Sequence, residues 1–404
     1  MTITSVALLS LLLQTPAPQP ASPPQSPADC LNATRDFASR RMKELGTPTN
    51  DNIRTLNAER QAMLRECTAK YDVDRTPVES LGPLIELYTE AQQPELARKA
   101  IDRGLADTTV TTAQRGNFLA LSIRMLLRQP KSDERNAAAE ALVDKLDGLG
   151  PEALEPQIAA HGSLNSYYRA DDIDAGIIKH SNWLIETGRH LAPELRKKYA
   201  YQFVSAYDNL AEAVAGHGEN DRALSILKDG KTDWPELASR LDPTLARYLT
   251  VGSEAPAIVA DTWLNNQTGT LPLKGKVTLL QFTAHWCGPC KESYPGMKRL
   301  TERFANDPFQ VVFFTQLYGY FGSEQKLTPA QETDRDREYY AGYGFKIPIA
   351  IGARGVEEAY KVGGIPQIVA IDKAGKIRLI MVGYDDANEE KLASFIKTLL
   401  AESR

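Results

Sequence analysis

The chain contains 404 residues, of which 42% are hydrophobic and 25% charged, and its formal net charge is -5. This length exceeds one ordinary hydrophobic core, so two or three domains are expected. The acidic balance, with no basic block, argues against binding to nucleic acid or to anionic membrane surfaces. No apolar run approaches the roughly 20 residues that span a bilayer.

Residues 1–21 have the layout of a secretory signal peptide, with an apolar run from Val6 to Leu13 followed by small residues and prolines. The positively charged start typical of such signals is absent, so a tail without a targeting role is the alternative. Residues 22–28 continue this proline-rich stretch and are predicted to form an extended linker.

Two helices around a turn are predicted between Cys30 and Asp72, because apolar residues recur at helical spacing on both sides of Pro48. Cys30 lies 18 residues before Pro48 and Cys67 lies 19 after it, so an antiparallel hairpin would bring both sulfurs to its open end. We expect a structural disulfide between them, which would indicate an oxidising compartment. The alternative is two unpaired, small apolar residues.

Helical periodicity dominates the rest of a predicted helical domain, residues 29–250. The segments 84–105 and 207–230 resemble tetratricopeptide-type helix pairs, although the tryptophan and glycine landmarks of that repeat are absent. A helical array would offer a concave surface to a peptide or protein partner. An irregular helical domain that only positions its neighbour is an equal alternative. Four histidines in this region lack metal-like spacing and are expected to be ordinary surface or hydrogen-bonded residues: His161, His180, His190 and His217.

The pattern changes near Val251, where extended segments begin to alternate with helices in a predicted domain of residues 251–404. We expect a sheet covered by helices on both faces. The predicted strands are 276–286, 309–316, 346–351, 367–372 and 376–383, and the predicted helices are 289–304, 329–340, 356–362 and 388–401. The fold class is therefore multidomain, with an all-α N-terminal region followed by an α/β domain.

The stretch TAHWCGPCKE, residues 283–292, places two cysteines where a buried strand meets a helix. A sulfur at the start of a helix is favoured as an anion by free backbone N–H groups and by the helix dipole. Lowering the pKa of Cys287 from about 8.5 to about 7 requires roughly 2 kcal/mol, which the most favourable helix termini supply. Pro289 fits the first turn of a helix, and His285 and Lys291 are expected to add positive charge.

These residues resemble the active site of thioredoxin-fold thiol:disulfide oxidoreductases, because WCGPCK matches the thioredoxin motif residue for residue. The segment GGIPQIVAIDKAGKI resembles the partner loop of that family, and the likeness covers about residues 251–402. VGSEAPAI at its start is similar to the TlpA/AhpC–TSA branch, whose members are typically exported bacterial enzymes. The resemblance thus implies the thioredoxin fold, a redox-active disulfide with no other cofactor or metal, and a location in the bacterial periplasm.

Carried over by position, Cys287 is the nucleophile, Cys290 the resolving thiol and Pro366 the cis-proline that faces them. Ile365 would offer its backbone to an extended substrate strand, and Trp286 would shield the sulfurs. The remaining supporting positions of the motif are His285, Gly288, Pro289 and Lys291.

The sequence departs from the family at two positions beneath the motif. Gln281 stands where thioredoxin has a buried acid, and Ser293 stands where many members of the branch have glutamate, with Glu292 adjacent. These departures concern proton transfer rather than disulfide exchange. The long aromatic stretch 318–345 is expected to form a lid over the cysteines, or else an ordinary solvated helix.

The resemblance predicts a reductase of protein disulfides, supplied with electrons by an upstream dithiol protein. Four alternatives differ in chemistry. A purely structural Cys287–Cys290 disulfide, spanning only two residues, would be strained and reducible, as a catalytic couple needs to be. Structural zinc needs four ligands, and only His285 accompanies the cysteine pair. A thiol peroxidase of related fold would carry threonine and proline where this chain has Ala284 and Leu280. An interaction scaffold would bind partners through the helical domain without using the cysteines.

Overall fold

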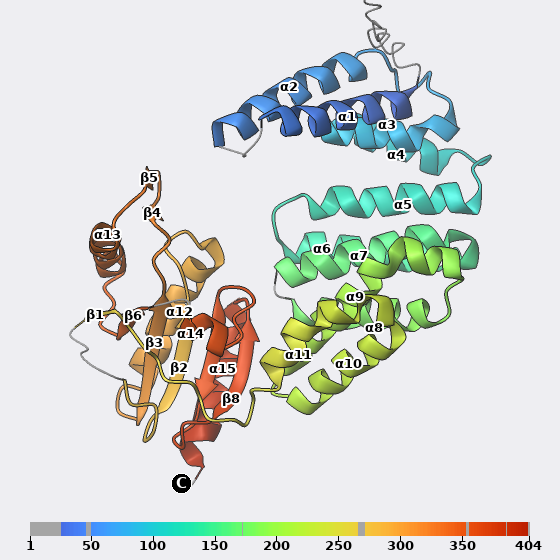
Figure 1. The fold of residues 1–404 in the computed structure, drawn as a ribbon. Helices are drawn as coiled ribbons and strands as arrows, with labels where there is room; N and C mark the ends of the chain where they lie inside the picture. Colours follow the sequence, from blue (N-terminus) through green and yellow to red (C-terminus); the bar gives the residue numbers. More distant parts are fainter. Residues whose placement is uncertain are drawn as a thin grey trace, which may run out of the picture. The chain divides into compact units, whose positions relative to one another are not determined.

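The computed structural model describes residues 26–45, 50–171, 173–265, 271–352, 355–384 and 386–402. They form two compact units, one running up to Met125 and including Leu149–Ala153, and a second made of Leu126–Gly148 and the chain from Leu154 onward (Figure 1). The predicted signal peptide, residues 1–21, and residues 22–25 of the predicted linker lie outside the described residues, whereas Pro27 and Ala28, also predicted as linker, begin the first helix. Within the described ranges, no helix is both long and apolar enough to cross a membrane.

The first unit is a stack of helices tied by a disulfide. Cys30 near the start of the first helix is bonded to Cys67 near the end of the second, and both sulfurs lie in the hydrophobic core of this unit. A closed loop with a sequence separation of 37 stabilises the unit by roughly 4 kcal/mol in the chain-entropy model. The helices are α1 (Pro27–Leu45), α2 (Asn50–Thr68), α3 (Leu81–Glu90), α4 (Pro94–Ala106) and α5 (Thr112–Leu127).

The second unit begins with six helices, of which α7 to α10 pack consecutively against one another. The turn after α9 is made by Gly218, whose φ of +83° suits glycine. A repeat architecture stays a prediction. The six helices are α6 (Asp133–Asp147), α7 (Leu154–Ala170), α8 (Asp174–Arg189), α9 (Pro193–Gly216), α10 (Asn220–Asp233) and α11 (Asp242–Tyr248).

Two of the four histidines meet inside this helical part. The Nδ1 atoms of His161 and His180 are 2.9 Å apart, and the outer ring nitrogens contact Asp147 at 3.2 Å and Glu140 at 2.9 Å. Trp183 stacks on His161 with ring centres 3.8 Å apart. Each imidazole is thus hydrogen-bonded within the protein, and the pair joins α6, α7 and α8.

A six-stranded sheet follows, with strand order β1-β6-β3-β2-β7-β8. The three central strands β6, β3 and β2 are parallel, while β1, β7 and β8 pair antiparallel with their neighbours. The sheet and the helices before it confirm the predicted fold class, all-α followed by an α/β thioredoxin fold. The strands are β1 (Thr262–Leu264), β2 (Val277–Phe282), β3 (Phe309–Thr315), β6 (Ile349–Ile351), β7 (Gln367–Ile371) and β8 (Ile377–Val382).

Three predicted elements are clearly shorter than expected. The strand predicted over residues 276–286 is β2, which ends at Phe282. The strand predicted over residues 346–351 begins only at Ile349, because Pro348 has no N–H to donate to a sheet. The helix predicted over residues 356–362 is α14 (Gly355–Ala359), which ends as Lys361 takes a positive φ of 52°. The Val362 N–H then bonds back to the carbonyl of Glu357, as in a helix C-cap.

Side chains of alternate residues in each strand enter two different cores. Val277 and Leu279 of β2 pack on one face against α12 (Gly288–Arg303) and α15 (Asp386–Ala401). Leu280 and Phe282 point to the other face. Burial of both faces explains why β2 is a nearly continuous apolar run instead of an alternating one.

The second face of the sheet is covered by helices of the same unit. Leu280 and Phe282 share one hydrophobic cluster with Val214 of α9 and Tyr248 of α11, and α9 packs along β8. The helical segments 126–148 and 154–249 therefore belong to one compact unit with the sheet. The predicted division into a helical domain ending at residue 250 and a second domain beginning at residue 251 stays a prediction.

Arg247 connects two helices of this unit to the loop before β7 through polar contacts. Its buried guanidinium contacts the Glu212 carboxylate at 2.5 Å and donates to the Lys361 carbonyl at 3.2 Å. A Cβ at Gly363 would lie 1.9 Å from the same guanidinium, so this approach requires glycine. The loop that precedes β7 is thereby fixed against α9 and α11.

The stretch 318–345 forms a small hairpin, β4 (Tyr320–Phe321) with β5 (Glu324–Gln325), followed by α13 (Pro329–Gly342). The buried Glu332 carboxylate accepts the N–H groups of Tyr318 at 2.7 Å and Gly319 at 2.6 Å. One turn later Asp336 is fully buried, and neither carboxylate oxygen has a hydrogen-bond partner among the described residues. Burial, with a smaller contribution from Glu332, raises the pKa of Asp336 to about 7.

Replacing Asp336 with Asn should stabilise the protein increasingly as the pH rises. The folded-state pKa lies above the unfolded value, so wild-type stability is fully present below about pH 4 and is lost as the pH rises through 7. The advantage of Asp336→Asn should grow by up to about 1.4 kcal/mol per pH unit in this window. Urea unfolding between pH 5 and pH 9 measures it. Asp334→Asn, an exposed change on the same helix, is the control, and a pH-independent difference for Asp336→Asn would contradict the assignment.

Candidate active site

The cysteine motif lies at the end of the central strand β2. Cys287 caps the N-terminus of α12, and Pro289 occupies its first turn, where no N–H is needed. The Cys290 N–H donates to the Cys287 sulfur, with the nitrogen 3.1 Å from Sγ. The sulfur of residue 287 is therefore held against the positive end of a sixteen-residue helix.

The two cysteines are joined in a disulfide, so the structure represents the oxidised form. Cys287 retains 3% exposure, whereas Cys290 is completely buried. When this bond is reduced, the cysteine that keeps slight exposure is also the one whose sulfur is nearest the free N–H groups, which favour its thiolate.

Pro366 lies across from this pair. The Ile365–Pro366 peptide bond is cis, and the Ile365 carbonyl oxygen is 3.7 Å from the Cys287 Sγ. Strand pairing explains the proximity, because Gln367 at the start of β7 is paired with Phe282 at the end of β2. Within the described residues, the backbone N–H and C=O of Ile365 bond to no other backbone group.

An aromatic cluster covers the residues before Cys287. The His285 ring stacks on Phe321 with centres 4.4 Å apart, and Tyr318 and Tyr320 meet its edges. Trp286 is 47% exposed and meets Tyr318 edge to face at 5.4 Å. The β4–β5 hairpin and Tyr318 therefore lie against His285 and Trp286, and a lid over the cysteines stays a prediction.

His285 and Lys291, the two side chains that were expected to add positive charge beside Cys287, contribute less than the sequence suggested. Burial lowers the pKa of His285 below its ordinary value of 6.5, so the ring is neutral at pH 7. The Lys291 ammonium lies 5.8 Å from the centre of the Tyr339 ring. Gly288 has open space where a side chain would be. The described contacts therefore leave the helix terminus as the principal source of positive potential at Cys287.

A short polar chain runs beneath Cys290, where the sequence lacks a buried acid. The buried Gln281 amide donates to the Ser293 hydroxyl at 2.7 Å, and that hydroxyl donates to the Cys290 carbonyl at 2.7 Å. Neither side chain ionises in the physiological range, so this chain can orient the helix but cannot take the Cys290 proton.

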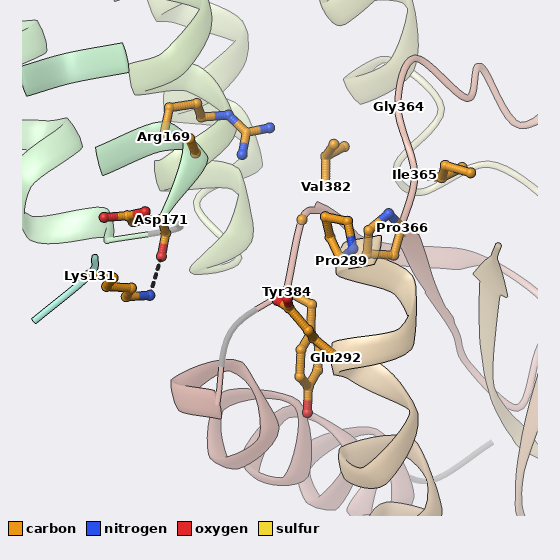
Figure 2. Close-up of a pocket in the computed structure, with 12 residues that line it drawn as sticks. Lys131, Arg169, Asp171, Pro289, Glu292, Gly364, Ile365, Pro366, Val382 and Tyr384 are labelled. Carbon is orange, nitrogen blue, oxygen red and sulfur yellow. Dashed lines mark hydrogen bonds between the residues drawn. The ribbon is translucent and has the colours of Figure 1, made fainter. Parts of the chain in front are cut away.

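A cavity of about 850 Å³ lies beside the cis-proline loop (Figure 2). One wall is the helix start and the loop before β7, and the opposite wall comes from the helical part of the same unit, carrying Lys131, Arg169 and Asp171. Reasoning from the sequence did not find these three residues. They lie more than a hundred residues from the motif and have no recognisable local pattern. Lining residues of the first wall are Pro289, Glu292, Gly364, Ile365, Pro366, Val382, Gly383 and Tyr384.

The described residues contain no group of three or more histidine, cysteine, aspartate or glutamate side chains arranged to hold a metal. What the site does offer is a dithiol or disulfide at a helix terminus, a backbone edge beside it and a cleft next to that edge.

Comparisons with known proteins identify the region around this site. Residues 250–396 match the Redoxin family model. Thioredoxin-like protein YneN of Bacillus subtilis is 29% identical over 133 residues, covering 33% of this chain and 71% of that protein. Thiol-disulfide oxidoreductase ResA of Bacillus thuringiensis is 27% identical over 151 residues, covering 37% of this chain and 78% of that protein.

A solved structure of a putative thiol:disulfide interchange protein DsbE from Chlorobium tepidum is 28% identical, with a TM-score of 0.31, covering 37% of this chain and 98% of that one. The Redoxin match, residues 250–396, falls on the sheet and the helices that carry the cysteine pair. The C-terminal region of this chain, which matches the Redoxin family model and is similar to thiol-disulfide oxidoreductases, is therefore a thioredoxin-fold, TlpA-like thiol:disulfide oxidoreductase domain.

Proposed function

We propose that the protein reduces disulfide bonds of other proteins through Cys287 and Cys290. The observation that carries this proposal is the position of the Cys287 sulfur, 3.1 Å from a helix N-terminal N–H and 3.7 Å from the Ile365 carbonyl. The first contact favours the thiolate, and the second places the sulfur beside a free backbone edge that an extended substrate strand can pair with.

The exchange takes two steps. In the reduced protein the Cys287 thiolate attacks one sulfur of the substrate disulfide, forming a mixed disulfide and releasing the other substrate sulfur, which takes a proton. The Cys290 thiol then loses its proton and attacks Cys287, which releases the second substrate thiol. Two electrons pass to the substrate, and the Cys287–Cys290 disulfide seen in this structure is the product.

Return to the dithiol requires two electrons from an upstream dithiol protein, by the same exchange in reverse. No organic cofactor or metal takes part in either step. Trp286 and Tyr318, whose rings meet edge to face, would shield the mixed disulfide from solvent.

We also propose that the protein is exported, with the bacterial periplasm as its compartment. Two observations support this: the signal-like sequence of residues 1–21, and the buried Cys30–Cys67 disulfide far from the redox pair in sequence. Structural disulfides of this kind persist in oxidising compartments.

Changing Cys290 to Ser should trap substrates. The first step proceeds without Cys290, but the mixed disulfide on Cys287 cannot be resolved, so partner proteins remain covalently attached. Non-reducing gels followed by mass spectrometry of captured proteins measure this. The matched control is the double variant Cys287→Ser/Cys290→Ser, which should capture nothing. Equal capture by both proteins, or full function of the Cys287→Ser variant, would favour an interaction scaffold over an enzyme.

The Gly288–Pro289 pair resembles that of reducing family members, so the Cys287–Cys290 couple should have a potential below about -180 mV. Equilibration with glutathione or dithiothreitol buffers, read by alkylation of the free thiols, gives the value. Protein with the Cys30–Cys67 pair changed to Ala, if it folds, isolates the signal of the redox couple. A potential near the -120 mV of strongly oxidising catalysts would reverse the proposed direction.

A further inference from the structure

The cavity beside Pro366 has a wall that the thioredoxin fold itself does not supply. Lys131 precedes α6, while Arg169 and Asp171 lie at the C-terminal end of α7, and these residues line the wall opposite the cis-proline loop (Figure 2). With about 850 Å³, the cavity is at the upper end of the range that takes a drug-sized molecule or a short peptide. A segment in this space would lie next to the free backbone edge of Ile365.

The second wall is fixed in place by a chain of ion pairs. Arg169 pairs with Glu212, the same carboxylate contacts Arg247, and Arg247 donates to the Lys361 carbonyl in the loop that leads to Pro366. A second tie joins Lys391 of α15 to Asp174 at the start of α8. The wall and the loop are thus linked through side chains that are largely buried, and the width of the cleft is set by the fold.

The charged side chains that line the cleft differ in whether they already have an ion-pair partner among the described residues. Arg169 shares the Glu212 carboxylate with Arg247, and Asp171 pairs with the buried Arg135. Lys131 is exposed, donates only to the Asp171 backbone carbonyl at 2.7 Å, and forms no ion pair with any described residue. On the facing wall, exposed Glu292 forms no ion pair within the described chain either. An occupant therefore meets a free ammonium on the helical side and a free carboxylate on the side of the cysteines.

We propose that this cleft binds an extended peptide segment of the substrate protein, and that Lys131 selects segments with an acidic side chain on the side that faces the helical wall. An extended strand pairs with the Ile365 backbone on one side, and its outward side chains then reach the helical wall. The free ammonium of Lys131 attracts a carboxylate there. This inference rests on the proposed reductase function and gives the helical part of the unit a role in choosing its substrate.

The test uses two flexible peptides of the same length, each containing one disulfide, flanked by Glu in one and by Lys in the other. Wild-type protein should reduce the Glu peptide with the higher kcat/KM, by about two- to fivefold, as expected for a partly exposed ion pair. Lys131→Glu should remove or invert this preference, mainly through KM. Lys228→Glu, the same charge change on α10 and outside the cavity lining, should leave it unchanged.

A small neutral disulfide, hydroxyethyl disulfide, tests the reductase proposal separately from the proposal that the cleft selects acidic peptides. Equal turnover of this compound by wild type and Lys131→Glu shows that the dithiol chemistry and the fold are intact. If it is turned over but Lys131→Glu leaves the peptide preference unchanged, the cleft assignment is wrong while the reductase proposal stands. If no disulfide is reduced, the reductase proposal itself fails. Faster reduction of glutathione disulfide than of either peptide would assign the cleft to a small molecule and overturn the peptide proposal.

Discussion

The contact between the Cys287 sulfur and the first turn of α12 determines the chemistry of the whole site. Cys287 is the residue that caps this helix, so the N–H of Cys290 is directed at its sulfur. A helix N-terminus offers both free donors and a partial positive charge, and a thiolate gains from both. With His285 neutral at pH 7 and Lys291 directed toward Tyr339, little else in the described surroundings favours the anion.

The helices before the sheet take part in the same architecture. Strand β2 must bury both faces, and its second face is covered by side chains from α9 and α11. That covering brings Arg247 to the loop before β7, and it gives the cleft its second wall. The same group of helices therefore does two things. It buries the second face of the sheet, and it forms the wall of the cleft that faces the cis-proline loop.

Local sequence signals predicted the parts of the fold that depend on neighbouring residues. The apolar run of β2, the helix after Pro289 and the hairpin turn at Gly375 all depend on a few adjacent residues. The position of Pro366 opposite the cysteines followed from family resemblance, since the pairing of Phe282 with the distant Gln367 has no local signature. The wall at Lys131 and the His161–His180 pair were missed for the same reason. Both depend on the packing of helices that are distant in sequence. Periodicity predicts which face of a helix is apolar, but it does not predict which other helix that face packs against.

The central claim concerns the ionisation of one sulfur, and it can be measured directly. In the reduced Cys290→Ser variant, with Cys30 and Cys67 still bonded, Cys287 is the only free thiol. Its thiolate can be followed by ultraviolet absorbance or by the pH dependence of its alkylation rate. The account predicts a pKa for Cys287 well below the ordinary value of about 8.5, near 7. A value at or above 8.5 would show that the helix terminus does not activate this sulfur, and would contradict the account.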